Sequence, residues 1–343
     1  MKQIHFEKKK SAYLLIFLSA KKYVLKQTLY ARYNKDKKPK NDKEYTTKPF
    51  FCPIFASMKI IECPRDAMQG MPTFIPTDRK IEYINTLLQV GFDTIDVGSF
   101  VSAKSVPQMR DTRDVLRALR MEDTDSKLLA IVANTRGATE ASDFEAITYL
   151  GFPFSISEIF QQRNTNASQE KAFRIVGEIL DICIRHDKEL VVYLSMCFGN
   201  PYGEFWDPAL VEHWADRFAS MGVATLSLSD TVGVATSDMV GSMVGSLTRD
   251  FPRIEFGVHL HSRPNDWREK IEAAYRNGCE RFDGALSGYG GCPFAQDALV
   301  GNIATENLVA FFEEERADFF VDPAAFEQAK TIANQIFLDA AKK

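Results

Sequence analysis

Residues able to bind a metal ion stand near the ends of short apolar runs in this chain. His259 and His261 close one such run and are separated by a single residue. If the run is a strand, both imidazoles point to the same face, because side chains two apart share a face. Asp66 could add a carboxylate and Asn302 a neutral amide oxygen. This mixed nitrogen and oxygen set, without thiolate, suits Mg²⁺ or Mn²⁺ better than a structural zinc ion.

Arg65 stands beside Asp66 but would serve different chemistry. Its guanidinium stays protonated and offers only hydrogen-bond donors, so it cannot bind a metal ion. Next to a metal ion it would stabilise negative charge that develops on an oxygen during a reaction. A lone Arg-Asp pair can equally be a salt bridge at the end of a barrel. From these two residues alone, both interpretations stay open.

The elements that would position these residues alternate regularly along the chain. From Met58, an apolar strand-like run, a loop and an amphipathic segment repeat at intervals of about 25–37 residues. The expected strands are 59–62, 93–97, 128–133, 154–158, 190–196, 223–228, 254–260 and 281–285. The expected helices include 78–90, 170–187, 208–221, 237–250 and 265–277, and glycines typical of helix ends are Gly91, Gly151, Gly222 and Gly278.

Eight such alternations predict a TIM (β/α)8 barrel. In this fold the carboxyl ends of all strands meet at one mouth, where active sites form. The candidate residues, although far apart in sequence, would therefore converge. A doubly wound sheet is the alternative fold for the same alternation.

Residues 1–57 differ from the rest of the chain. They contain thirteen Lys and one Arg against four acidic residues, and they lack sustained helical or strand periodicity. We expect a basic, poorly structured extension, either disordered or a mispredicted upstream translation, before a catalytic barrel domain at 58–343. An ordered or targeting segment is the alternative. The apolar stretch 12–20 is too short to span a membrane.

The composition narrows the class of protein. The chain has 343 residues, of which 45% are hydrophobic and 26% charged, and a net charge of −4. Because the positive charge is concentrated in residues 1–57, we expect neither a nucleic acid nor a membrane as partner of the folded part. Six cysteines without a CxxC pair favour reduced thiols and a cytoplasmic location.

Five segments, taken together, resemble the hydroxymethylglutaryl-CoA lyase family of metal-dependent TIM barrels. They are 62–69, 99–109, 229–233, 259–261 and 290–306, and the resemblance spans roughly 58–315. The resemblance implies that Asp66, His259, His261 and Asn302 bind a divalent metal ion, Mg²⁺ or Mn²⁺. It also implies that Arg65 steadies the reacting oxygens of the substrate and that Asp96 and Asp230 lie nearby.

The same resemblance implies a substrate and a further catalytic residue. The substrate would be a CoA thioester, a 3-hydroxy-3-methylacyl-CoA such as hydroxymethylglutaryl-CoA, cleaved to acetyl-CoA and a 3-oxo acid such as acetoacetate. Cys292 would lie on a mobile glycine-rich loop and take part in catalysis. Gly290 and Gly291 before it give backbone freedom that a buried filler residue does not need. A homodimer is the family expectation.

Some positions depart from the family pattern and leave the acyl group open. Asp96 stands where a Glu is usual, Ser262 where an Asp is usual, and Ala67-Met68 where Gly-Leu is usual. A Claisen-condensing synthase of the isopropylmalate or citramalate type is the alternative on the same barrel. Such synthases usually carry a further C-terminal domain, and the Gly-Gly-Cys-Pro loop favours the lyase. A hydroxy-oxoacid aldolase and a non-catalytic binding module are weaker alternatives.

Overall fold

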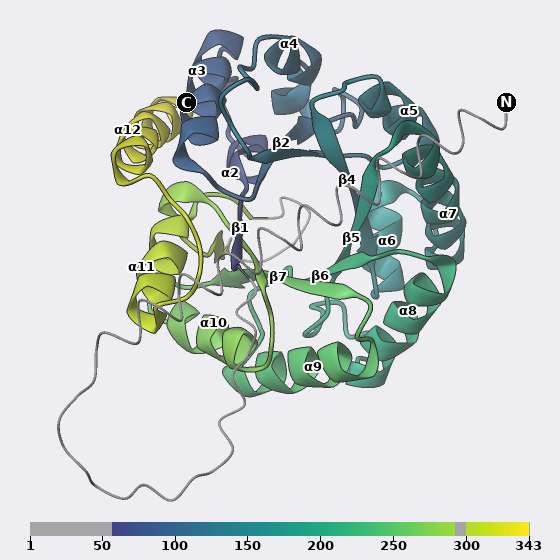
Figure 1. The fold of residues 1–343 in the computed structure, drawn as a ribbon. Helices are drawn as coiled ribbons and strands as arrows, with labels where there is room; N and C mark the ends of the chain where they lie inside the picture. The colour runs from purple at the N-terminus through teal and green to yellow at the C-terminus, as the bar shows by residue number, and fades with distance from the viewer. Residues whose placement is uncertain (1–56, 292–299, 343) are drawn as a thin grey trace, which may run out of the picture. The chain divides into compact units, whose positions relative to one another are not determined.

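Eight parallel strands close into a barrel in the computed structural model, which describes residues 57–291 and 300–342. Neighbouring strands pair in chain order, and the ring closes through the pairing of β1 with β8. The strands are β1 (Lys59–Glu62), β2 (Thr94–Ser99), β3 (Lys127–Ile131), β4 (Ile147–Ser155), β5 (Glu189–Ser195), β6 (Thr225–Asp230), β7 (Glu255–Ser262) and β8 (Arg281–Gly284). The predicted TIM barrel is confirmed (Figure 1).

Helices surround the barrel, as Figure 1 shows. Shorter elements lie in the segments that connect strands and helices. The helices are α2 (Pro64–Gln69), α3 (Thr77–Val90), α4 (Thr112–Arg117), α5 (Thr135–Ser142), α6 (Glu158–Thr165), α7 (Gln169–His186), α8 (Pro208–Met221), α9 (Ser237–Asp250), α10 (Trp267–Arg276), α11 (Thr305–Glu315) and α12 (Pro323–Ala340). The shorter elements are the 3₁₀ turns η1 (Pro107–Met109) and η2 (Leu286–Gly288), and β9 (Gly301–Asn302), which pairs antiparallel with β7. Among the described residues, no helix combines the length and apolar character needed to cross a bilayer.

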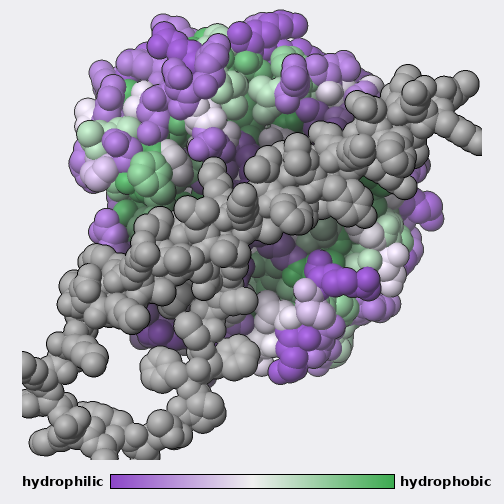
Figure 2. Space-filling view, in the orientation of Figure 1, coloured by the Kyte–Doolittle hydropathy of each residue, from purple (hydrophilic) through white to green (hydrophobic). Residues whose placement is uncertain are grey.

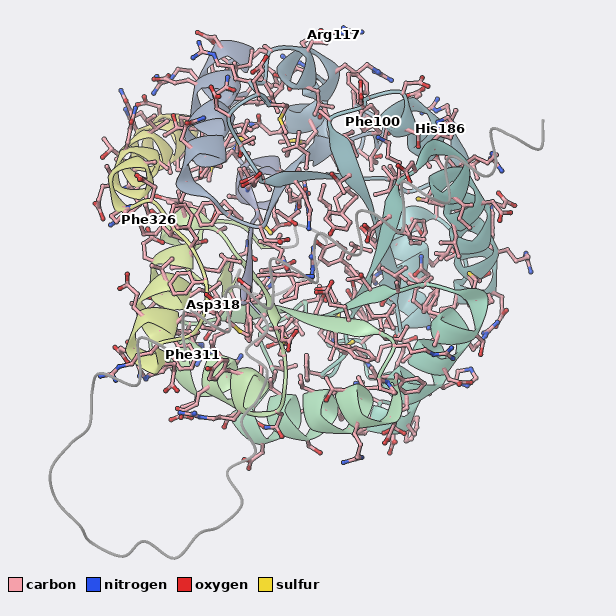
Figure 3. All side chains as sticks on the ribbon, viewed as in Figure 1. Phe100, Arg117, His186, Phe311, Asp318 and Phe326 are labelled. Carbon is pink, nitrogen blue, oxygen red and sulfur yellow. The ribbon has the colours of Figure 1, made fainter. Side chains whose placement is uncertain are left out.

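Apolar side chains fill two spaces, one between the strands and the helices and one inside the barrel. Figure 3 shows side chains crowding both spaces. The inner cluster consists of Leu129, Ile131, Tyr149, Val191 and Tyr193 from three neighbouring strands. Hydrophilic residues predominate along the rim of the face drawn in Figure 2. Burial of the apolar side chains in both spaces stabilises the barrel, and the barrel in turn positions the polar residues at the strand ends.

Strand β4 corrects one expectation from the sequence. The expected strand at 154–158 is wrong in its bounds, because β4 runs from Ile147 to Ser155 and Gly151 lies in its middle rather than at a helix end. A Cβ at Gly151 would lie 2.6 Å from Cδ1 of Ile131 and 3.0 Å from Cδ2 of Leu129. The glycine is therefore required by packing inside the barrel. The other expected strands agree with the structure to within two residues at each end.

Glu62, at the end of β1, ties the first strand to the last part of the barrel. The backbone N–H of Leu286 donates to its Oε1 at 3.0 Å, and the Thr305 hydroxyl donates to its Oε2. The side chain is fully buried. Burial raises the pKa of Glu62 to about 8, an effect that the two hydrogen bonds only partly offset.

We expect Glu62→Gln to change how stability depends on pH. The raised pKa means that the carboxyl's contribution to the free energy of unfolding is fully present below its ordinary pKa of 4.5. That contribution is lost as the pH rises through about 8. Glutamine keeps an acceptor for Leu286 and does not ionise. As the pH rises from roughly 5 to 8, the free energy of unfolding of the variant should increase by about 2–4 kcal/mol relative to that of wild type. Denaturant titration at each pH measures this difference. Parallel pH profiles for the two proteins would contradict this.

Candidate active site

The candidate metal ligands come from three separate elements at the carboxyl end of the barrel. His259 and His261 lie on β7, Asn302 on β9, and Asp66 on α2, the short helix that follows β1. Asp66 therefore lies one step beyond the strand end at which the sequence placed it, because Pro64 starts a helical turn there. One ligand atom each from Asp66, His259 and His261 lie within 4.8 Å of one another.

His261 presents an atom suited to a metal ion. Its Nδ1 lies 3.1 Å from the carbonyl oxygen of Thr231, which makes Nδ1 the protonated donor. Nε2 is buried and has no hydrogen-bond partner within the described part of the chain. Burial, together with the neighbouring His259, lowers the pKa of His261 to about 4, so the ring is neutral near pH 7. A buried neutral nitrogen lone pair without a donor fits a metal ligand.

His259 is oriented by a carboxylate that the sequence pattern did not single out. Its Nδ1 lies 3.1 Å from Oδ2 of Asp283, a buried residue of β8. Burial opposes protonation of His259, but the hydrogen bond and charge of Asp283 raise its pKa above the ordinary value. A carboxylate behind a histidine fixes the ring and increases the basicity of the opposite nitrogen. The strand alternation of β8 was the signal that could have found Asp283, since Arg281 and Asp283 share one face.

Asp66 is held as an ionised carboxylate. Its Oδ1 accepts from Nη1 of Arg65 at 2.9 Å and from Nε2 of Gln69 at 2.7 Å, and its Oδ2 accepts from Nδ2 of Asn302 at 2.7 Å. Burial would raise the pKa of Asp66, but Arg65 and the two histidines outweigh burial and lower the pKa to about 2. Because Asn302 uses its amide nitrogen here, its side-chain oxygen is the atom able to bind a cation.

Gly290 makes room for two of these residues. It adopts a φ of +108°, and a Cβ there would lie 2.4 Å from Nδ2 of Asn302 and 2.9 Å from Oδ2 of Asp66. Both the backbone conformation and the close approach therefore require glycine.

We expect Gly290→Ala to lower the affinity for Mn²⁺ by about tenfold or more, because the added methyl group displaces Asp66 and Asn302. Isothermal titration calorimetry on the metal-free protein measures this. Gly70→Ala is the matched control, since a methyl group added at Gly70 would meet nothing within 4 Å and the residue has an ordinary φ of −90°. Equal Mn²⁺ affinities for the two alanine variants would contradict the assigned packing.

Arg65 is fixed between two carboxylates and also lines the cavity beside the ligands. Its Nε lies 3.0 Å and its Nη2 2.5 Å from Oδ2 of Asp96, while Nη1 contacts Asp66 and Gln69. Burial raises the pKa of Asp96 to about 6 even though Arg65 opposes the shift. Arg65 is therefore a salt-bridge partner of both carboxylates and also lines the cavity beside the candidate ligands, while its role toward developing negative charge stays a prediction.

The remaining candidates lie differently. Asp230 is buried and does not line the cavity; its oxygens accept from the backbone N–H groups of Val234 and Ala235 and from Nζ of Lys270. Cys292 lies outside the described residues. Burial raises the pKa of each of four other cysteines, so none of them is poised as a thiolate: Cys63, Cys183, Cys197 and Cys279.

A cavity of about 700 Å³ opens beside the candidate ligands. Asp66, His259 and His261 line it together with Arg65. Its wall, formed by the segments after β2, β3 and β4, also carries four cationic side chains: Lys104, Arg136, Arg163 and Lys171. A cavity of this size with several basic residues fits a large anionic ligand such as a phosphorylated cofactor.

The chain is similar to hydroxymethylglutaryl-CoA lyases over about three quarters of its length. It is 35% identical to the cytoplasmic 3-hydroxy-3-methylglutaryl-CoA lyase of Mus musculus, over 74% of this chain and 73% of that protein. It is 32% identical to the hydroxymethylglutaryl-CoA lyase of Bacillus subtilis, over 73% of this chain and 83% of that protein.

Solved structures agree. The HMG-CoA lyase of Bacillus subtilis superposes with a TM-score of 0.77 at 29% identity, covering 84% of this chain and 95% of that one. An Acinetobacter baumannii HMG-CoA lyase, solved with coenzyme A and 3-methylmalate, gives a TM-score of 0.76 at 30% identity, covering 82% of this chain and 91% of that one. The family model described as HMGL-like matches residues 58–333, and the chain therefore belongs to the HMGL-like family.

Proposed function

We propose that this protein is a divalent-metal-dependent carbon-carbon lyase that cleaves hydroxymethylglutaryl-CoA to acetyl-CoA and acetoacetate. One observation carries the proposal: Asp66, His259 and His261 converge within 4.8 Å beside Arg65, in a chain similar to curated hydroxymethylglutaryl-CoA lyases. A lone cluster of this kind would support only metal binding. The family membership supplies the class of reaction.

The proposed metal ion is Mg²⁺ or Mn²⁺, held by Asp66, His259 and His261 with the side-chain oxygen of Asn302. The ionised Asp66, the neutral His261 and the absence of thiolate among these four side chains fit such an ion. When bound, the ion supplies Lewis-acid polarisation of the substrate's oxygens, which lowers the pKa of the tertiary hydroxyl.

The proposed reaction conserves all atoms of the substrate. The tertiary hydroxyl gives its proton to a general base, either a side chain of the site or a water molecule; the bond between C2 and C3 then breaks, and C3 becomes the ketone carbon of acetoacetate. The electron pair of the broken bond passes to the thioester group, and C2 then takes up a proton to give acetyl-CoA. Arg65, held by Asp96, would offset the charge on the thioester oxygen. We propose, from the family resemblance, that Cys292 supplies the final proton. From their contacts with Arg65 and Lys270, we propose that Asp96 and Asp230 act by positioning other groups.

The basic wall of the cavity would bind the CoA part of the substrate. Phosphate groups are bound well by arginine and lysine side chains, and besides Arg65 four such residues line this cavity: Lys104, Arg136, Arg163 and Lys171. The similar lyase from Acinetobacter baumannii was solved with coenzyme A, which supports the same class of ligand here. The acyl end of the substrate would then lie toward the candidate ligands.

A substrate panel tests the lyase against the condensing synthase. Purified protein with Mn²⁺ is incubated either with hydroxymethylglutaryl-CoA or with acetyl-CoA plus a 2-oxo acid, pyruvate or a branched one. The lyase should release acetyl-CoA and acetoacetate in equal amounts without free CoA thiol. A synthase would instead release CoA thiol from the second mixture, because condensation ends in thioester hydrolysis. That outcome, without cleavage of hydroxymethylglutaryl-CoA, would overturn the proposal.

We propose that the catalytic domain runs from Met58 to Lys343. The backbone N–H of Met58 donates to the Asp318 carbonyl at 2.7 Å, and β1 starts at the next residue. A chain that begins at Met58 should therefore keep its turnover and its melting temperature, measured by steady-state kinetics and calorimetry. Aggregation, or a melting temperature lower by several degrees, would show that residues 1–57 belong to the folded unit.

We propose a cytoplasmic location, as in the names of relatives from mouse, rat and human, although mitochondrial relatives match as well. We propose a homodimer because the family resemblance implies one. Cell fractionation tests the location, and sedimentation equilibrium tests the oligomeric state.

A further inference from the structure

We propose that Lys270 is a positioning residue that sets His261 in the orientation needed to bind the metal ion. The inference rests on the proposed metal site and extends it to a residue outside the cavity. Lys270 lies on α10, the helix that follows β7, and its side chain is 7% exposed. A lysine is rarely buried to this degree unless its charge is paired.

Lys270 contacts two neighbouring strands: β7, which carries His261, and β6, which ends at Asp230. Its Nζ donates to the backbone carbonyl of His261 at 3.0 Å and to Oδ2 of Asp230 at 3.1 Å. Asp230 ends β6, which pairs with β7 in register up to Leu260. The ammonium group therefore joins the ends of both strands at the level of the ligand.

Asp230 in turn folds the loop that follows it. Its two oxygens accept from the backbone N–H groups of Val234 at 2.9 Å and Ala235 at 3.0 Å. Thr231, in the same loop, accepts from the backbone N–H of Met196 through its hydroxyl at 3.0 Å. The position of the Thr231 carbonyl is thus set by contacts on both sides.

The Thr231 carbonyl is the partner of the His261 ring, at 3.1 Å from Nδ1. A closed circuit results, from Lys270 to Asp230, through the loop to Thr231, to the His261 ring, and back through the His261 carbonyl to Lys270. The hydrogen bond to Thr231 places the proton on Nδ1 and leaves Nε2 for the metal ion. Lys270 holds the backbone of His261 directly and the acceptor of its ring through Asp230.

This circuit also explains why Asp230 is buried away from the cavity. Without Lys270, the Asp230 carboxylate would lose its buried cationic partner, which favours rearrangement of the loop. Movement of the Thr231 carbonyl would release the Nδ1 proton, and the ring could then carry its proton on Nε2. That tautomer cannot bind a metal ion through Nε2.

The test compares two buried lysines in the full-length protein. Lys80, on α3, is 2% exposed and pairs with Oδ1 of Asp111 at 2.7 Å, but it does not line the cavity. Lys270→Met and Lys80→Met each leave one buried carboxylate unpaired. Both should lower the melting temperature by several degrees.

Only Lys270→Met should weaken Mn²⁺ binding, by about tenfold or more in calorimetry, as loss of an outer-sphere partner does. In the metal-free protein, ¹⁵N chemical shifts of the His261 ring should show that the Nε2-protonated tautomer appears in Lys270→Met and not in Lys80→Met. Unchanged Mn²⁺ affinity and an unchanged tautomer in Lys270→Met would overturn the inference and leave Lys270 as a structural ion pair.

A double variant and a measurement on the metal-free protein complete the experiment. If Lys270→Met does not fold, the double variant Lys270→Met/Asp230→Asn removes the unpaired charge. It should fold, bind Mn²⁺ weakly and show the altered tautomer, whereas wild-type values would overturn the inference. The tautomer measurement needs no metal ion and no substrate, so failure of the wild-type protein to bind Mn²⁺ or to cleave hydroxymethylglutaryl-CoA would contradict the proposed function separately.

Discussion

His261→Ala and Asp66→Ala should each lower turnover by several orders of magnitude. Each change removes a proposed metal ligand, and the remaining residues cannot replace the lost imidazole or carboxylate. The loss of metal binding is easiest to interpret for His261, because its buried Nε2 has no hydrogen-bond partner among the described residues. The scaffold should remain folded, since neither residue belongs to the apolar clusters that fill the barrel and the space around it.

Steady-state kinetics after chelation and stepwise return of Mn²⁺ measure this effect. His186→Ala is the matched control, because His186 is exposed at the end of α7, on the outside of the barrel (Figure 3). The control should retain wild-type turnover and metal dependence. Near-normal turnover of His261→Ala or Asp66→Ala in metal-depleted buffer would rule out the assigned ligands.

Arg65→Gln should lower kcat by about 10²–10³ and change KM far less. The guanidinium is held by Asp96 and Asp66 before substrate arrives, so it needs no reorganisation to meet charge that develops during bond cleavage. Ground-state binding gains less from such a donor. Mn²⁺ affinity should change much less than kcat, because Gln69 and Asn302 still donate to Asp66.

Arg217→Gln is the control for the arginine substitution. Arg217 pairs with Glu170 at 2.6 Å on the surface and takes no part in the cavity lining, so its loss should leave kcat unchanged. Kinetics and calorimetry on both variants separate the roles. If Arg65→Gln lost Mn²⁺ binding and its turnover fell only in proportion to the bound metal, the prediction would be contradicted. Arg65 would then act only by holding the metal ligands in place.

The local sequence pattern was sufficient to predict the barrel and to predict that His259 and His261 lie on the same face of one strand. Strand alternation places His259 and His261 on one face whatever the rest of the chain does. Alternation of strands and helices then limits the topology to few choices. The β4 bounds failed because Gly151 serves packing against Ile131 and Leu129, a contact between strands that no local rule contains.

Contacts between distant segments could not be derived from the sequence. The resemblance implies only that Asp230 lies nearby, and it does not give the contacts of Asp230 with its own loop and with Lys270, which is 40 residues further along the chain. Strand alternation could have placed Asp283 on the inner face of β8, but its hydrogen bond to His259 on the neighbouring strand β7 appears only in the folded chain. Such residues act through burial and geometry, which only the folded chain defines.

Metal-dependent cleavage of hydroxymethylglutaryl-CoA is the most direct test of the proposed function. The full-length protein is freed of metal by chelation, supplied with hydroxymethylglutaryl-CoA, and followed by chromatography while Mn²⁺ is added in steps. Acetyl-CoA and acetoacetate should appear in equal amounts and rise with Mn²⁺ until the proposed site of Asp66, His259, His261 and Asn302 is filled. No cleavage at saturating Mn²⁺, or full cleavage in the presence of chelator, would contradict a metal-dependent lyase.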